Sequence, residues 1–98
     1  MKKIVLLCAS GMSTSILMNK MREAAKELNY DCEIVAHAIP TAKETASDAD
    51  MVLLGPQVSY QLNNMKGILT CPVEVIDMMA YGIMDGTSII KHVQEVIG

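Results

Sequence analysis

Residues 8–15, C-A-S-G-M-S-T-S, form the stretch of the sequence whose residue types and spacing best suit chemistry. The stretch holds one thiol, three serines, one threonine and a glycine. Gly11 permits a tight or positive-φ turn, in which successive backbone N–H groups can face a single anion. A helix that begins just afterwards would add the positive end of its dipole. The stretch therefore predicts a phosphate-binding loop with Cys8 at its rim.

Cys8 is the candidate nucleophile, because N–H groups and a helix start stabilise the thiolate, which is the reactive form of cysteine. The alternative is that Cys8 is a small core residue and that Ser13 or Thr14 merely caps a helix. Cys8 follows the first expected strand and is itself followed by hydroxyl groups. This position favours the interpretation of Cys8 as a nucleophile over that of a core residue. Cys32 and Cys71 lack such surroundings, and we interpret them as structural.

The charges around this loop favour a phosphoryl carrier over a phosphatase. Cysteine phosphatases place an arginine six residues after the cysteine, where it clamps the phosphoryl oxygens. Thr14 occupies that position here, and residues 4–19 contain no Lys or Arg. The loop also lacks an Asp or Glu that could protonate a leaving group. It is therefore suited to holding a phosphoryl group without promoting its hydrolysis.

The elements that must position this loop alternate along the chain, as in an α/β domain with a parallel sheet. Short runs rich in apolar residues predict four strands, at residues 3–7, 32–37, 51–54 and 73–76, of which the first and third are expected to be buried and the second to lie at an edge. Apolar spacing and capping signals predict four helices, beginning near residues 13, 41, 57 and 89. Residues 77–86 are expected to form a loop.

These elements predict a flavodoxin-like three-layer sandwich, with helices on both faces of a four-stranded parallel sheet of order 2-1-3-4. Ligands of such sheets bind beyond the carboxyl ends of the strands, where the strand order reverses. The loops that begin at Cys8, Gly55 and Asp77 should therefore face a common site. In the second helix, Thr41 and Glu44 have the spacing of a capping box.

Composition narrows the class of protein. The 98 residues suit one domain, residues 1–98, with 51% hydrophobic and 19% charged residues. The net charge of −3 and the scattered basic residues argue against nucleic-acid binding. No C-x-x-C pair or apolar run of membrane-spanning length occurs, so we expect no metal, no cofactor and a cytoplasmic chain. We also expect a monomer.

Three motifs, taken together, resemble the IIB component of the lactose/cellobiose family of the bacterial phosphoenolpyruvate-dependent sugar phosphotransferase system. They are C-A-S-G-M-S-T-S, L-L-G-P-Q-V-S-Y at residues 53–60 and P-V-E-V-I-D at residues 72–77, followed by Tyr81-Gly82 and Asp85-Gly86. A stand-alone chain is similar to the cellobiose or chitobiose type. The resemblance extends from end to end of the chain.

The resemblance implies that Cys8 accepts a phosphoryl group from a phosphohistidine of a IIA partner. Cys8 would then pass it to a sugar bound by the membrane permease IIC, with which the chain would associate transiently. Its phosphate loop would comprise Ala9, Ser10, Gly11, Met12, Ser13, Thr14 and Ser15.

Partners should dock around this loop. Polar or adaptable residues of the neighbouring loops are the candidates for contact, namely Gln57, Tyr60, Asp77, Met78, Met79 and Tyr81. The alternatives are a relative of the low-molecular-weight cysteine phosphatases and a response-regulator-like or flavodoxin-like binding module. Thr14, at the position of the phosphatase arginine, argues against the phosphatase relative. The lack of an acidic pair after the first strand, and the scarcity of aromatic residues, argue against the second. His37 and His92 are not expected to be catalytic.

Overall fold

A parallel four-stranded sheet forms the centre of the computed structural model, which describes residues 1–9 and 14–98. Its strands are β1 (Lys2–Cys8), β2 (Cys32–Ala38), β3 (Met51–Leu54) and β4 (Val73–Val75). They are ordered β2-β1-β3-β4, which confirms the predicted order. The expected strands were correct to within one residue at each end.

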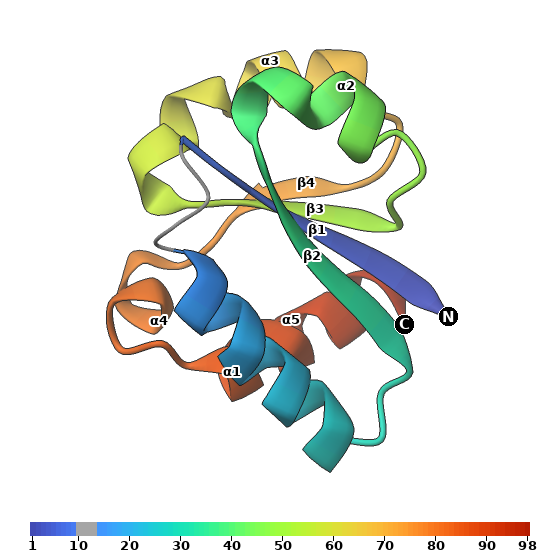
Figure 1. The fold of residues 1–98 in the computed structure, drawn as a ribbon, viewed down its shortest axis with the longest axis vertical. Coiled ribbons are helices and arrows are strands. Elements are labelled where there is room, and N and C mark those ends of the chain that lie inside the picture. Colours follow the sequence, from blue (N-terminus) through green and yellow to red (C-terminus); the bar gives the residue numbers. More distant parts are fainter. Residues whose placement is uncertain (10–13) are drawn as a thin grey trace.

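Helices cover both faces of the sheet (Figure 1). One face carries α1 (Thr14–Glu27), α4 (Met78–Gly82) and α5 (Gly86–Ile97), and the other carries α2 (Ala42–Thr45) and α3 (Leu62–Ile68). Two short 3-10 helices, η1 (Ile39–Thr41) and η2 (Pro56–Gln61), lead into α2 and α3. The arrangement is the three-layer α/β sandwich that the sequence predicts. None of the helices in the described part of the chain is long and apolar enough to cross a membrane.

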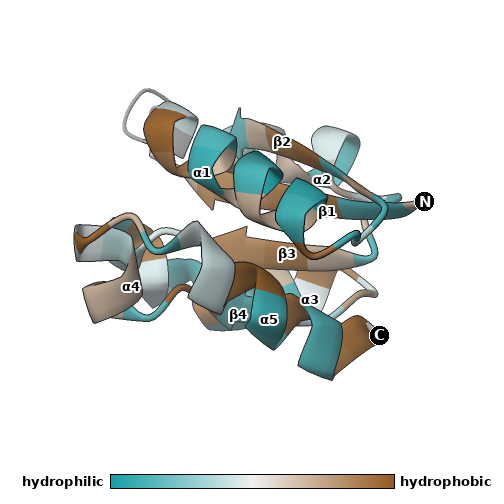
Figure 2. Cartoon of the chain, turned by 90° about the horizontal axis from the view of Figure 1, so that it is seen from below, coloured by the Kyte–Doolittle hydropathy of each residue, from teal (hydrophilic) through white to brown (hydrophobic). Residues whose placement is uncertain are grey.

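The core consists of two apolar clusters, one on each face of the sheet. Strand residues alternate between the faces, so Ile4 and Leu6 belong to the cluster under α1 and α5, whereas Val5 and Leu7 belong to the other. All four side chains are fully buried. In Figure 2, β3 is hydrophobic throughout, whereas α1 alternates between hydrophilic and hydrophobic residues. This is the pattern of a central strand buried on both faces and a helix buried on one.

Three local expectations need correction. The expected loop at residues 77–86 contains α4, because the Asp77 side chain caps a short helix by accepting a 3.0 Å hydrogen bond from the Ala80 N–H. Thr41 precedes α2 but does not form the capping box, since its hydroxyl donates to the Ala38 carbonyl at 2.8 Å. The helix expected from residue 57 is instead η2 followed by α3.

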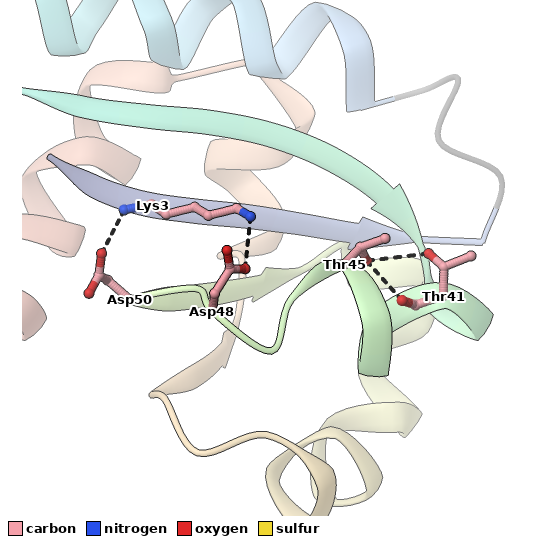
Figure 3. A network of polar contacts seen from close by, with 5 residues as sticks. All are labelled: Lys3, Thr41, Thr45, Asp48 and Asp50. Atoms are coloured by element: carbon pink, nitrogen blue, oxygen red, sulfur yellow. Dashed lines mark hydrogen bonds and ion pairs between the residues drawn. The ribbon is translucent and has the colours of Figure 1, made fainter.

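The amino ends of the strands, far from the candidate site, are held by polar contacts around Lys3 (Figure 3). The Lys3 N–H donates to Asp50 Oδ2 at 2.7 Å, and the Asp50 N–H donates back to the Lys3 carbonyl at 2.8 Å. Lys3 Nζ also pairs with Asp48 at 2.8 Å. The hydrogen bond raises the pKa of Lys3 and lowers the pKa of Asp48. These contacts fix where β3 begins relative to β1.

Candidate functional site

Cys8 is the last residue of β1 and lies at the carboxyl edge of the sheet. It is 4% exposed, whereas the next residue, Ala9, is exposed. Strand alternation places Cys8 on the same face as Ile4 and Leu6, which is the face covered by α1 and α5. The central strand therefore presents the thiol at the point where the chain leaves the sheet.

The turn after β3 lies beside Cys8, as the sequence predicts for the reversal of strand order. The Gly55 N–H donates a 3.0 Å hydrogen bond to the Leu7 carbonyl. A Cβ added at Gly55 would lie 4.0 Å from the Cys8 Cβ and 3.1 Å from Gln57 Oε1. The Gln57 amide and the Cys8 side chain therefore border the same glycine. Gln57, one of the six docking candidates, thus lies at the turn that borders Cys8.

The helix that follows Cys8 begins at Thr14 and has no acidic residue in its first turn. Its positive dipole end is therefore not offset by a nearby carboxylate of its own first turn. Ser15 and Ile16 are exposed in that turn. Ser10, Gly11, Met12 and Ser13 lie outside the described residues, so the geometry of the phosphate loop stays a prediction.

The remaining docking candidates lie in η2, in α4 and at the N-cap of α4. These elements lie together with the start of α1 at one end of the molecule (Figure 1). Tyr60 in η2 is 77% exposed. Met78 and Met79 are each 75% exposed, so both side chains are available to a partner. Tyr81 is half-buried against the core cluster under α1 and α5.

This end of the molecule is poor in charge. Residues 4–19 and 54–65 contain no charged residue, and residues 75–90 contain only two, Asp77 and Asp85. Both aspartates accept hydrogen bonds from backbone N–H groups at helix starts. None of these three segments contains a Lys or Arg that could pair with a phosphoryl group.

The other two cysteines differ from Cys8 in their surroundings. Burial raises the pKa of the Cys32 thiol and of the Cys71 thiol, which disfavours their thiolate forms. Cys32 begins β2, and Cys71 packs against the cluster on the opposite face from α1. Both observations support the interpretation that these two residues are structural. Within residues 1–9 and 14–98, no group of His, Cys, Asp and Glu could hold a metal ion.

One polar pair was not foreseen from the sequence. His92 Nε2 in α5 lies 2.6 Å from Glu74 Oε1 in β4, and His92 Nδ1 lies 3.7 Å from Glu95. The hydrogen bond with Glu74 raises the pKa of His92. His92 and Glu74 are 18 positions apart, so no local sequence pattern could have revealed the pair.

Comparison with known proteins gives the family. The family model for the lactose/cellobiose-specific IIB subunit of the sugar phosphotransferase system (PTS) matches residues 3–92. The chain belongs to this family. This IIB chain is 49% identical to the oligo-beta-mannoside-specific EIIB component of Bacillus subtilis, in an alignment that covers 88% of the chain and 86% of the relative. It is 37% identical to the galactose-specific EIIB component of Lactococcus lactis, with 98% and 96% covered.

Solved structures of IIB proteins share the fold of this IIB chain. The cellobiose-specific IIB component of Borrelia burgdorferi has a TM-score of 0.80 and 30% identity, with 98% of this chain and 91% of that chain covered. The lactose-specific IIB domain of Streptococcus pneumoniae has a TM-score of 0.87, with 99% of this chain and 98% of that chain covered. Its sequence identity is 20%, so this similarity concerns the fold alone. The IIB chain is thus a phosphotransferase that passes a phosphoryl group to sugar within the PTS. This assignment favours phosphoryl transfer over the phosphatase alternative.

Proposed function

We propose that Cys8 carries the phosphoryl group. Its position at the carboxyl end of the central strand supports this proposal, since the turn at Gly55 borders that position and α1 begins at Thr14, six residues along the chain. Ala9, Thr14 and Ser15, together with the intervening residues 10–13, would form the loop that binds the phosphoryl oxygens. Backbone N–H groups and the dipole of α1 would stabilise the negative charge.

The transfer has two steps. In the first, the Cys8 thiolate attacks the phosphorus of a phosphohistidine on the IIA donor, so that an S–P bond forms and the N–P bond breaks. The histidine ring leaves with the electron pair of that bond. In the second step, a sugar hydroxyl oxygen attacks the phosphorus and the thiolate leaves. The hydroxyl proton passes to a base, for example in the permease.

The two steps require two partners at one sulfur. The IIA donor and the sugar-loaded permease IIC would therefore bind in turn over the edge formed by η2, α4 and the start of α1. Gln57, Tyr60, Met78 and Met79 would contact them, and their exposure supports this function. Asp77 would hold α4 in place through its cap. We further propose that the IIB chain acts as a monomer at the inner face of the membrane.

The permease would select the sugar, because the permease binds it and the IIB chain presents only the phosphoryl group. We propose a disaccharide of the cellobiose or chitobiose kind. Relatives named for oligo-beta-mannoside, galactose and cellobiose all align with this chain, which supports a shared chemistry across different sugars.

Mass spectrometry of the intact chain tests the proposal directly. After incubation with a phosphorylated IIA protein, the wild-type chain should gain one phosphoryl group, and Cys8→Ser should gain none and support no sugar phosphorylation. Cys32→Ser and Cys71→Ser are the matched controls and should be phosphorylated like the wild type. Transfer through Cys8→Ser would refute the proposal. Sustained hydrolysis of small phosphate esters by the wild type would favour the phosphatase alternative instead.

A further inference from the structure

A cavity of about 260 Å³ opens between the end of β4, α4 and α5. Its interior is apolar, whereas three polar side chains lie at its rim. The interior includes Leu53, Ile76 and Ala80, and the rim consists of Asp77, Ser88 and His92. All three rim residues are exposed, so the cavity is accessible from solvent. We call it the α4–α5 cavity.

The size of the α4–α5 cavity favours a side chain as its occupant. Sites for drug-sized ligands are about 300–1,000 Å³, so this cavity is small for a disaccharide. Its apolar interior also lacks the dense polar lining that a sugar needs. One large apolar side chain, inserted from a partner protein, would bury its surface there without leaving polar groups unpaired.

The position of the cavity connects it to the carboxyl edge that holds Cys8. Leu53 of the cavity lies in β3 beside Leu6 of β1, on the face of the sheet that alternation also assigns to Cys8. The helix α4, which provides Ala80 to the cavity, displays Met78 and Met79 outward. A protein that covers Cys8 and these methionines would therefore extend to the mouth of the cavity.

The charge at the mouth indicates the chemistry of that partner. Asp77 lies at the rim, and Glu74 and Glu95 contact the two ring nitrogens of His92. None of the residues that line the cavity is Lys or Arg. These three carboxylates outnumber His92 and the neighbouring Lys91 of α5, so the mouth has a net negative charge. A partner that inserts an apolar side chain here gains affinity when a basic residue flanks it.

We propose that the α4–α5 cavity receives an apolar side chain of the IIA donor, flanked by a basic residue of that protein. This inference rests on the proposed function, because it assumes that a donor covers Cys8. The cavity adds a fixed anchor point to an otherwise flexible contact surface of methionine side chains. It thereby orients the donor relative to the Cys8 edge.

The first test fills the cavity mouth. Ser88→Leu places a branched side chain there, and Asp85 can still cap the helix because it bonds the backbone N–H of residue 88. The KM for the phosphorylated IIA protein should rise at least about fivefold with kcat unchanged, as expected for loss of one interface anchor. Thr87→Leu, at the adjacent exposed position outside the cavity, is the matched control and should leave the KM unchanged. Equal KM values for both folded variants and the wild type would overturn the proposal.

A second measurement does not depend on the folding of any variant. Unphosphorylated IIA protein is added to the wild-type chain, and the methyl signals of Ile76 and Ile89, which both line the cavity, are followed by NMR. Both signals should shift and saturate together with those of Met78 and Met79. Shifts at the methionines without shifts at the two isoleucines would overturn the proposal.

The charge at the mouth has its own test. Glu95→Gln should weaken IIA binding at low salt and have no effect at about 1 M salt, where screening extends over only about 3 Å. An unchanged affinity at low salt would contradict a basic flanking residue. The proposed function is tested separately: phosphorylation of the Cys8→Ser variant would refute it. The proposal for Cys8 and the proposal for the α4–α5 cavity can therefore fail independently.

Discussion

Gly86, the first residue of α5, lies directly against the backbone of Lys20 in α1. A Cβ added at Gly86 would lie 2.5 Å from both the carbonyl carbon and the carbonyl oxygen of Lys20. Backbone atoms cannot move aside as a flexible side chain can, so only glycine fits. Because α1 begins after Cys8 and α5 borders the α4–α5 cavity, this contact fixes two functional parts of the molecule relative to each other.

Gly86→Ala should therefore destabilise the fold by about 1–3 kcal/mol, the usual cost of overpacking a tight contact. Gly67→Ala is the control, since Gly67 lies exposed in α3 with nothing within 4 Å of an added Cβ. That variant should gain roughly 0.5–1 kcal/mol from the better helix propensity of alanine. Urea denaturation of both variants measures the two effects, and equal stabilities would contradict the close contact.

Replacing both exposed methionines of α4 tests the docking surface. Met78→Gln together with Met79→Gln should change the free energy of unfolding by less than about 0.5 kcal/mol, because both side chains are 75% exposed. The KM for the phosphorylated IIA protein should rise, since the apolar contact area is lost. Ile68→Gln, an exposed apolar position at the end of α3, is a control that should leave the KM unaltered. A wild-type KM in the double variant would show that partners bind elsewhere.

The His92–Glu74 pair should make stability depend on pH. Because the hydrogen bond to Glu74 raises the folded-state pKa of His92, the pair stabilises the fold below the ordinary value of 6.5. That contribution falls as the pH rises through the folded-state pKa. Both side chains are partly exposed, at 50% and 38%, so we expect less than about 1 kcal/mol.

The measurement compares the wild type with Glu74→Gln by urea denaturation at several pH values. The wild type should be the more stable protein near pH 6, and the difference should shrink by pH 9. Glu95→Gln, whose carboxylate lies farther from the ring at 3.7 Å, should show a smaller effect. A difference that grows with pH would have the wrong sign for this pair.

The two aspartates near Lys3 should differ in their effect on stability (Figure 3). Asp50→Ala removes the 2.7 Å acceptor of the Lys3 backbone N–H at the start of the sheet and should cost about 1 kcal/mol. Asp48→Ala removes only an exposed partner of the Lys3 ammonium group, so its effect should be smaller. Thermal unfolding of the two variants under the same conditions shows which of them loses more stability. A larger loss of stability for Asp48→Ala than for Asp50→Ala would contradict this prediction.

Much of the fold could be predicted because the signals for it are local. Runs such as residues 51–54 are apolar at every position, which marks a strand buried on both faces. The strand order followed from the alternation of strands and helices. Asn29, just after α1, adopts a positive φ of 54°, a conformation typical of residues that end helices. By contrast, α4 was missed because five residues are too few to show a helical period.

The sequence by itself determined the order of the strands, the family and the placement of a thiol after the first strand, since each follows from short motifs and from their succession along the chain. Only the tertiary structure decided which distant groups meet. It paired His92 with Glu74 and packed Gly86 against Lys20. These contacts depend on how helices and strands far apart in sequence pack together, and packing is a property of the whole core rather than of any short stretch of residues.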